Sequence, residues 1–308
     1  MKKLISLMIA LVCILSFVAC DGSGSSKAIR ELEPSGEKIY AADMRRLVSK
    51  RQETYLEEDM AKYEKQSDKW FDVQIKMSMI SEEDGDSMEI YYMIDGKMGF
   101  VDMSELVMDV EIVIEGENVS HDIEGKKITE SMSLKGDLIL VDGVAYVDIT
   151  LKEKGPDGER EESVKQMGEL DDAFDYADIE DMLDLIGDPS DYESSVYGLN
   201  ITELLNSVAG GVGVNYYSDE DRIFIDYRES QETTSQKAEM VMQYDIEFEK
   251  NSAIVKTTNV YVRTFIESEY NYGIEKVHSL SDIKIGMEVK QISSASIKAP
   301  DLEGYEQA

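Results

Sequence analysis

The sequence has few of the residues that build common metal and redox sites. Its 308 residues include only two His, two Cys, four Pro and one Trp, which argues against a zinc site made of His and Cys. Basic residues are scarce as well, because 31 Lys and Arg face 65 Asp and Glu and leave a net charge of −34. Binding to nucleic-acid phosphates requires Lys and Arg, so we expect no nucleic-acid partner.

Motifs of nucleotide-binding and hydrolytic enzymes are missing too. The sequence contains no G-x-x-x-x-G-K-[ST] loop, no G-x-G-x-x-G turn and no G-x-S-x-G nucleophile elbow. Its two imidazoles are His121, in a polar stretch, and His278, near a strand edge. A Ser-His-Asp site needs three converging groups, and nothing around either histidine indicates one. We therefore expect no catalytic residue, no cofactor and no enzymatic activity.

The many carboxylates do not form a recognisable metal-binding loop. Asp84 with Asp86, and Asp219 with Asp221, are oxygen-rich pairs in turns. Neither pair matches the spacing of a calcium-binding EF-hand loop. We interpret the acidic residues as a solvated surface and assign no metal site, while weak binding of divalent cations stays open.

The N-terminus has the pattern of an export signal. Lys2 and Lys3 precede an apolar run over 4–19, which is short for a membrane span of about 20 residues and fits the apolar region of a signal peptide. The run ends Phe17-Val18-Ala19-Cys20, followed by Asp21 and then by Gly and Ser over 22–26. This resembles the bacterial lipoprotein signal, although Phe17 replaces the usual Leu.

The resemblance implies cleavage before Cys20 and lipidation of Cys20. The alternative is an ordinary signal peptide that is cleaved nearby. Because the signal contains Lys2, Lys3 and Cys13, the processed chain would have a charge of −36 and no free thiol. Anionic headgroups repel such a chain, so the acyl chains on Cys20 would have to hold it at the extracytoplasmic face of a bacterial cell membrane.

The remainder of the chain predicts one domain. Apolar residues recur at helical spacing over 40–66, around a basic middle, and alternate with polar residues over 71–79. Asp95-Gly96 and Asp142-Gly143 indicate hairpin turns. Helical patterns return over 171–186 and 200–209, and strands follow. The expected organisation is a signal peptide (1–19), a lipidated Cys with a flexible tether (20–38), a single domain (39–300) and an acidic tail (301–308).

This order of elements resembles the LolA/LppX-like superfamily of half-barrel lipoprotein carriers. The resemblance rests on the lipidated Cys and tether, the long helix, and hairpins of the form D-G-x-x-[YF]-[VI], found at 142–147 and, with one additional residue, at 95–101. A closing Ile297-Lys298-Ala299-Pro300 adds to it. It implies an α+β fold in which a curved antiparallel sheet, a half-barrel, packs on the N-terminal helix and the mid-chain helical insert. It also implies binding of a lipid, an acylated molecule or another apolar ligand.

Two groups of apolar residues are candidates for a ligand site. From helical spacing within the insert we nominate Met182, Leu183, Leu204 and Leu205. Methionines on predicted strands are further candidates for an adaptable apolar pocket, namely Met77, Met79, Met240 and Met242. Both groups also fit a filled core, and for the methionines a filled core is the preferred interpretation. In that case the protein is a non-catalytic interaction or structural lipoprotein of the cell envelope.

Overall fold

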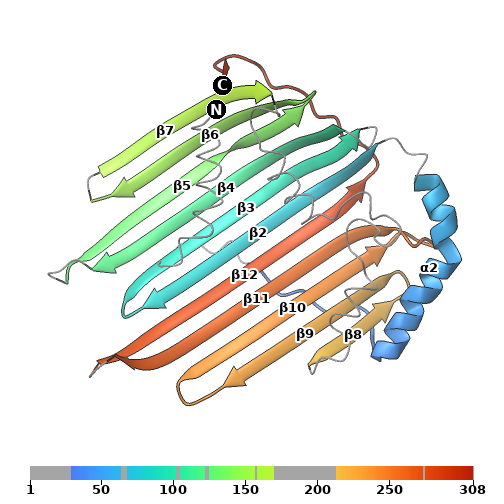
Figure 1. Ribbon diagram of the computed structural model, residues 1–308, viewed down its shortest axis with the longest axis horizontal. Helices are drawn as coiled ribbons and strands as arrows, with labels where there is room; N and C mark the ends of the chain where they lie inside the picture. The colour runs from blue at the N-terminus through green and yellow to red at the C-terminus, as the bar shows by residue number, and fades with distance from the viewer. Residues whose placement is uncertain are drawn as a thin grey trace.

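The computed structural model describes residues 29–63, 68–101, 105–121, 125–156, 158–169, 213–272 and 275–307. These residues form thirteen strands and a single helix, and all of the strands belong to one sheet (Figure 1). The expected α+β class is therefore wrong, because the described chain is almost entirely β. The helical insert expected over 171–186 and 200–209 lies outside the described residues.

Two antiparallel meanders make up the sheet. The first consists of β2 (Lys69–Glu83), β3 (Asp86–Val101), β4 (Glu105–His121), β5 (Lys127–Val141), β6 (Val144–Gly155) and β7 (Gly158–Glu169). The second consists of β8 (Val214–Asp219), β9 (Arg222–Glu232), β10 (Gln236–Phe248), β11 (Val255–Tyr272) and β12 (Glu275–Ile292). β12 pairs with β2 and so joins the meanders, while β1 (Glu37–Ile39) lies beside β8 and β13 (Glu306–Gln307) beside β7.

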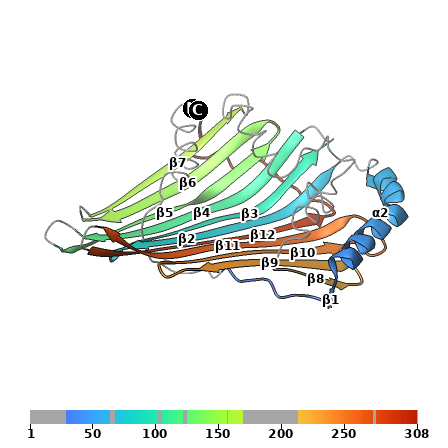
Figure 2. The ribbon, with the colours of Figure 1, turned by 60° about the horizontal axis from the view of Figure 1, so that its bottom comes forward.

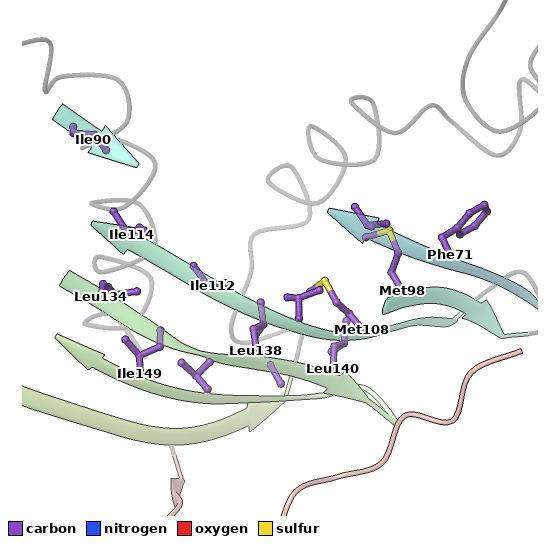
Figure 3. Close-up of a cluster of buried hydrophobic side chains, with 14 of the residues drawn as sticks. Phe71, Ile90, Met98, Met108, Ile112, Ile114, Leu134, Leu138, Leu140 and Ile149 are labelled. Atoms are coloured by element: carbon purple, nitrogen blue, oxygen red, sulfur yellow. The ribbon is translucent and has the colours of Figure 1, made fainter. Parts of the chain in front are cut away.

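Alternation along the strands places both buried clusters on one face, while the other face is mixed and carries charged side chains together with buried apolar ones such as Trp70, Val113 and Phe224. Residues two apart on a strand share a face, and the registers align the apolar sets of neighbouring strands. The sheet curves, so that β5 to β7 rise out of the plane of β8 to β10 (Figure 2). The apolar side chains lie on the inner side of this curve (Figure 3). We call the two sides the concave face and the convex face.

Two glycines on the concave face let neighbouring strands approach closely. A Cβ at Gly96 would lie 2.2 Å from the carbonyl oxygen of Asp109, and one at Gly136 would lie 2.1 Å from that of Asp148. Glycine in a strand often marks such a bend. The hairpin expected at Asp95-Gly96 is therefore wrong, because β3 continues through it. At Asp142-Gly143 the turn does form, with φ angles of 53° and 72°, the conformation that favours Asp-Gly in tight hairpins.

The single helix of the described chain, α2 (Ala41–Tyr63), does not cover the sheet. It stands beside the strand ends near β8 to β10 (Figures 1 and 2). Met44 and Val48 are its buried apolar residues and pack on this end of the concave face. Arg45, Arg46 and Lys50 are exposed. An apolar stripe this narrow buries only one end of a sheet, which explains why the expected helix-on-sheet layers do not form.

The concave face has two buried clusters. The larger spans β2 to β6 and contains Phe71, Val73, Met88, Ile90, Met98, Met108, Val110, Ile112, Ile114, Leu134, Leu138, Leu140, Ala145, Val147 and Ile149 (Figure 3). The smaller lies under α2 and contains Met44, Val48, Tyr216, Ile223, Ile225, Ile246, Phe248 and Val255. Strand β12 and most of β11 lie between the two clusters, which reach β10 and the start of β11 on one side and β2 on the other.

The N-terminal segment crosses the convex face. The Leu32 amide donates to the side-chain oxygen of Gln243 at 2.8 Å, and Gln243 is fully buried. Arg228 pairs with Glu31 at 2.7 Å. Residues 29–36, which the sequence assigns to a tether, are thus attached to β9 and β10 before β1 begins.

The C-terminal segment reaches the opposite edge of the sheet. The Tyr305 ring meets the Tyr146 ring edge-on, with centroids 5.8 Å apart, and the Lys165 ammonium lies 4.8 Å from the Tyr305 centroid. β13 then pairs with Gln166 and Met167 of β7. Each chain end thereby covers part of an edge strand, which limits edge-to-edge association.

Candidate ligand-binding surface

A strip of partly exposed apolar side chains lies between the two buried clusters of the concave face. We call it the central strip. Its members come from four adjacent strands and are Met77 and Met79 of β2, Met240 and Met242 of β10, Val262 and Ile266 of β11, and Ile283 and Ile285 of β12. Four of these eight side chains are methionines, whose unbranched thioethers adapt to irregular partners.

The strand registers bring these side chains into rows. In one row Met242 lies opposite Val262, Val262 opposite Ile285, and Ile285 opposite Met77. Directly paired residues on one face have Cβ atoms about 5 Å apart. This row is therefore a continuous apolar track that crosses the strands at right angles.

A second row runs parallel to the first. It joins Met240 to Thr264, Thr264 to Ile283, and Ile283 to Met79. Met79 in turn lies opposite Ile90 of β3, a member of the larger buried cluster. The central strip thus continues into the packed part of the face.

Exposure separates the central strip from its surroundings. Met240 is 37% exposed and Ile266 is 38% exposed, whereas Ile223, Ile225 and Ile246 of the smaller cluster are at most 1% exposed. Complete burial of a Met or Ile side chain is worth roughly 1.5–3 kcal/mol. A ligand that covers the strip would gain part of that free energy at several positions together.

Two tyrosines beside the strip have raised pKa values, which indicates an apolar environment. Met77 lies opposite Tyr92, and burial raises the pKa of Tyr92 to about 12. Tyr244 lies two residues beyond Met242 on the same face, and burial raises its pKa as well. Both phenols stay uncharged at neutral pH, so the strip is flanked by groups that hydrogen-bond without adding charge.

The structure brings together Met77, Met79, Met240 and Met242, the methionines that the sequence suggests for an apolar pocket. The pairing of β10, β11, β12 and β2 assembles them from segments more than 150 residues apart. Reasoning from the sequence missed Ile283 and Ile285, although their alternation with polar residues is a readable signal. Cys20 and the nominees Met182, Leu183, Leu204 and Leu205 lie outside the described residues.

Both histidines lie on the surface. Nδ1 of His121 is 2.7 Å from an Asp86 carboxylate oxygen, and Nε2 of His278 is 3.2 Å from Glu267. Within the described part of the chain, no three His, Cys, Asp or Glu side chains are grouped so that they would hold a metal ion. Among the same residues, no helix combines the length and the apolarity that a membrane crossing requires.

Comparison with known proteins gives no family. The sequence matches no family model and no curated protein. Among solved structures, it is similar to the translocator domain of the autotransporter NalP from Neisseria meningitidis, with 10% identity, over 82% of this chain and 96% of that chain. The TM-score is 0.14, so the two backbones do not superpose, and this likeness informs neither fold nor function.

Proposed function

We propose that the protein is a membrane-anchored, extracytoplasmic lipoprotein that binds an apolar or acylated ligand on its concave face. The central strip is the observation on which the proposal depends. It places four methionines and four branched aliphatic residues side by side and leaves them partly open between two packed clusters. The export signal and Cys20 support the anchored location.

The chemistry of the strip suits binding rather than catalysis. Its side chains offer thioethers and hydrocarbon, and its polar neighbour Thr264 supplies a single hydroxyl. Contact with an alkyl chain gains about 0.8 kcal/mol for each buried methylene. Affinity would therefore grow with chain length, and selectivity for the ligand's polar end would have to come from residues outside the strip.

Titration with a fluorescent fatty-acyl probe tests the proposal. The chain would begin at residue 20 and carry Cys20→Ser, so that no lipid of its own competes for the strip. We expect saturable binding that weakens about tenfold in Met79→Asn and in Met240→Asn, since a tenfold change corresponds to about 1.4 kcal/mol. Circular dichroism would verify that each variant keeps its sheet.

Ile80→Asn provides the matched control. Ile80 neighbours Met79 in β2 but lies on the convex face, opposite Asp282 and Glu89. We expect this variant to bind the probe as tightly as the unaltered chain. If no acyl or isoprenoid probe binds, the proposal is wrong, and a non-catalytic lipoprotein that contacts other envelope proteins takes its place.

A further inference from the structure

Residues 29–36 lie across the strands on the convex face, and we call them the N-terminal strap. The Leu32 amide donates to the buried Gln243 of β10 at 2.8 Å. A Cβ at Gly36 would lie 2.2 Å from the carbonyl oxygen of Ser218 on β8. In Figure 2 the strap is the thin blue trace that leads into β1 along the outer side of the curve. The strap therefore runs over β10, β9 and β8 toward the β1 edge of the sheet.

The other end of the strap lies over the middle of the sheet. A Cβ at Gly286 of β12 would be 3.1 Å from Cγ2 of Ile29, so the Ile29 side chain occupies the space above this glycine. β12 is the sixth strand counted from β1 and the eighth counted from β13. Because neighbouring strands are about 4.8 Å apart, Ile29 is about 24 Å from β1 and about 34 Å from β13. Ile292, at the nearer end of β12, is about 20 Å away along the strand.

The covalent chain limits the distance between this point and the lipid anchor. Cys20 precedes Ile29 by nine residues, which span about 30 Å when fully extended. An anchor on Cys20 can therefore reach a membrane directly from the middle of the convex face. To hold the concave face against the membrane, the same residues would have to pass an edge and then the thickness of the sheet, about 10 Å with its side chains. That path uses the whole extended length of the segment even at the nearest edge.

The convex face around Ile29 carries no net charge. On β2, β3 and β12 the convex positions within 72–80, 93–97 and 282–290 hold four lysines and four carboxylates. They are Lys76, Lys97, Lys284, Lys290, Asp72, Asp95, Asp282 and Glu288. The chain as a whole has a charge of −34, and an acidic surface is repelled by anionic headgroups. The middle of the convex face is thus a region that can approach a phospholipid surface at little electrostatic cost.

We propose that the N-terminal strap holds the convex face toward the membrane and turns the concave face, with the central strip, away from it. The partner of the convex face is the phospholipid surface that receives the acyl chains of Cys20. This inference rests on the anchored location in the proposed function, but it does not require that the strip binds a ligand. A ligand would reach the strip from the extracytoplasmic space and not laterally from the membrane.

Quenching by lipid-bound nitroxides tests this orientation. Once Cys13 is removed and Cys20 is acylated, the chain has no free thiol. Glu288→Cys on the convex face and Ile266→Cys on the concave face therefore each provide a single exposed site for a fluorescent label. The acylated variants would be placed in phosphatidylcholine vesicles in which some lipids carry a nitroxide on the headgroup. We expect the label at 288 to be quenched at least about twofold more strongly, because the sheet and its side chains add about 10 Å at 266.

Lengthening the tether provides the matched control. About twenty Gly and Ser residues inserted after Ser26 would extend its reach to about 95 Å, enough to pass any edge of the sheet, and the difference between the two labels should disappear. If the difference persists with the longer tether, or if both labels are quenched equally with the natural one, the inference is overturned and ligand binding by the strip is unaffected. If the purified chain carries no acyl group, the anchored location in the proposed function is overturned together with the inference.

Discussion

Gly99 lies directly opposite Trp70 across β2 and β3, and the indole fills the space where a side chain would be. A Cβ on Gly99 would lie 2.4 Å from Cε3 of the indole and 2.8 Å from the Lys69 carbonyl oxygen. Trp70 is the only tryptophan and is 8% exposed. Its fluorescence therefore reports on the pair of strands that joins the central strip to the larger cluster.

Gly99→Ala is expected to destabilise the fold. The added methyl group must displace the indole or the backbone, and overpacking of this kind costs about 1–3 kcal/mol. Urea denaturation followed by Trp70 fluorescence would measure the loss. Gly116→Ala is the matched control on β4, because its Cβ would have no neighbour closer than 3.8 Å. Equal stability of the two variants would contradict the packing argument.

Arg51 links α2 to the sheet through hydrogen bonds and a ring contact. Its guanidinium donates to Asp221 at 2.6 Å and to the Glu249 carbonyl at 2.8 Å, bonds the Ser252 carbonyl, and lies 4.5 Å from the Phe248 ring centroid. The Arg51 side chain is only 9% exposed. We infer that this one residue aligns the helix with two loops of the second meander.

Arg51→Met should lower the free energy of unfolding by about 3 kcal/mol, because it leaves a partly buried carboxylate and two carbonyls without their donor. Arg51→Lys should recover only part of the loss, since an ammonium cannot reproduce the forked geometry. Thermal or urea denaturation measures both. In contrast, Arg46→Ala should change stability by less than about 0.5 kcal/mol, as that side chain is 80% exposed. A large effect at Arg46 and none at Arg51 would refute this assignment.

Local signals predicted the turn at Asp142-Gly143 and many of the strands, but they were wrong at Asp95-Gly96, which lies inside β3. The alternation over 71–79 lies within β2, and Asp142-Gly143 forms the β5–β6 turn. The charged strand β7 was missed because it has almost no apolar alternation. Cross-strand ion pairs support it instead, Lys152 with Glu161 at 3.3 Å and Lys154 with Glu159 at 2.7 Å. Pairing of this kind is visible only once the register is known.

Non-local pairing decides the fold class and the candidate site. No local pattern indicates that β12 adds to β2 across about 200 residues. Without that pairing, Met77 and Ile285 are merely alternating apolar residues on separate strands. The expectation that helices pack on the face of the sheet was wrong for a similar reason. The apolar face of the helix is readable from the sequence, but the area of sheet it faces is set by thirteen strands that join in one layer.

Asp137 is expected to make stability depend on pH. On the convex face it lies between Glu111 and Asp148, its direct neighbours on β4 and β6. Desolvation, followed by the charges of Glu111, Asp109 and Asp148, raises its pKa above the usual value. Glu111 and Asp148 have the partners Lys135 and Lys165. Asp137 has no ion-pair partner within the described chain.

A raised pKa means that the folded state favours the protonated acid. The charged Asp137 carboxylate therefore costs the folded protein no free energy below pH 3.9 or so, about the pKa of Asp in the unfolded chain. This cost appears as the pH rises through the pKa that Asp137 has in the folded state. Asp137→Asn should leave stability unchanged near pH 3 and increase it at pH 7 by a few tenths of a kcal/mol, which is typical of a like-charged cross-strand pair. Urea denaturation at the two pH values measures this difference.

Asp72→Asn is the opposing control for Asp137→Asn. Asp72 lies on the same face between Lys97 and Lys290, its direct neighbours on β3 and β12. Loss of its charge should slightly destabilise the protein at pH 7, because two favourable cross-strand pairs disappear. If both Asn variants shift stability in the same direction, the explanation based on neighbouring charges is wrong.

Cys20 is expected to be the only acylated residue. The sequence Ala19-Cys20 ends an apolar run of signal-peptide length, and the strongly acidic chain needs acyl groups to remain at an anionic membrane. Cys20→Ala should therefore abolish incorporation of an acyl-chain analogue in labelled bacterial cells and should block removal of the signal peptide. Cys13→Ala is the matched control and should be labelled as strongly as the unaltered protein. Equal labelling of all three proteins would show that the anchor is elsewhere, and the location assumed in the proposed function would then have to be abandoned.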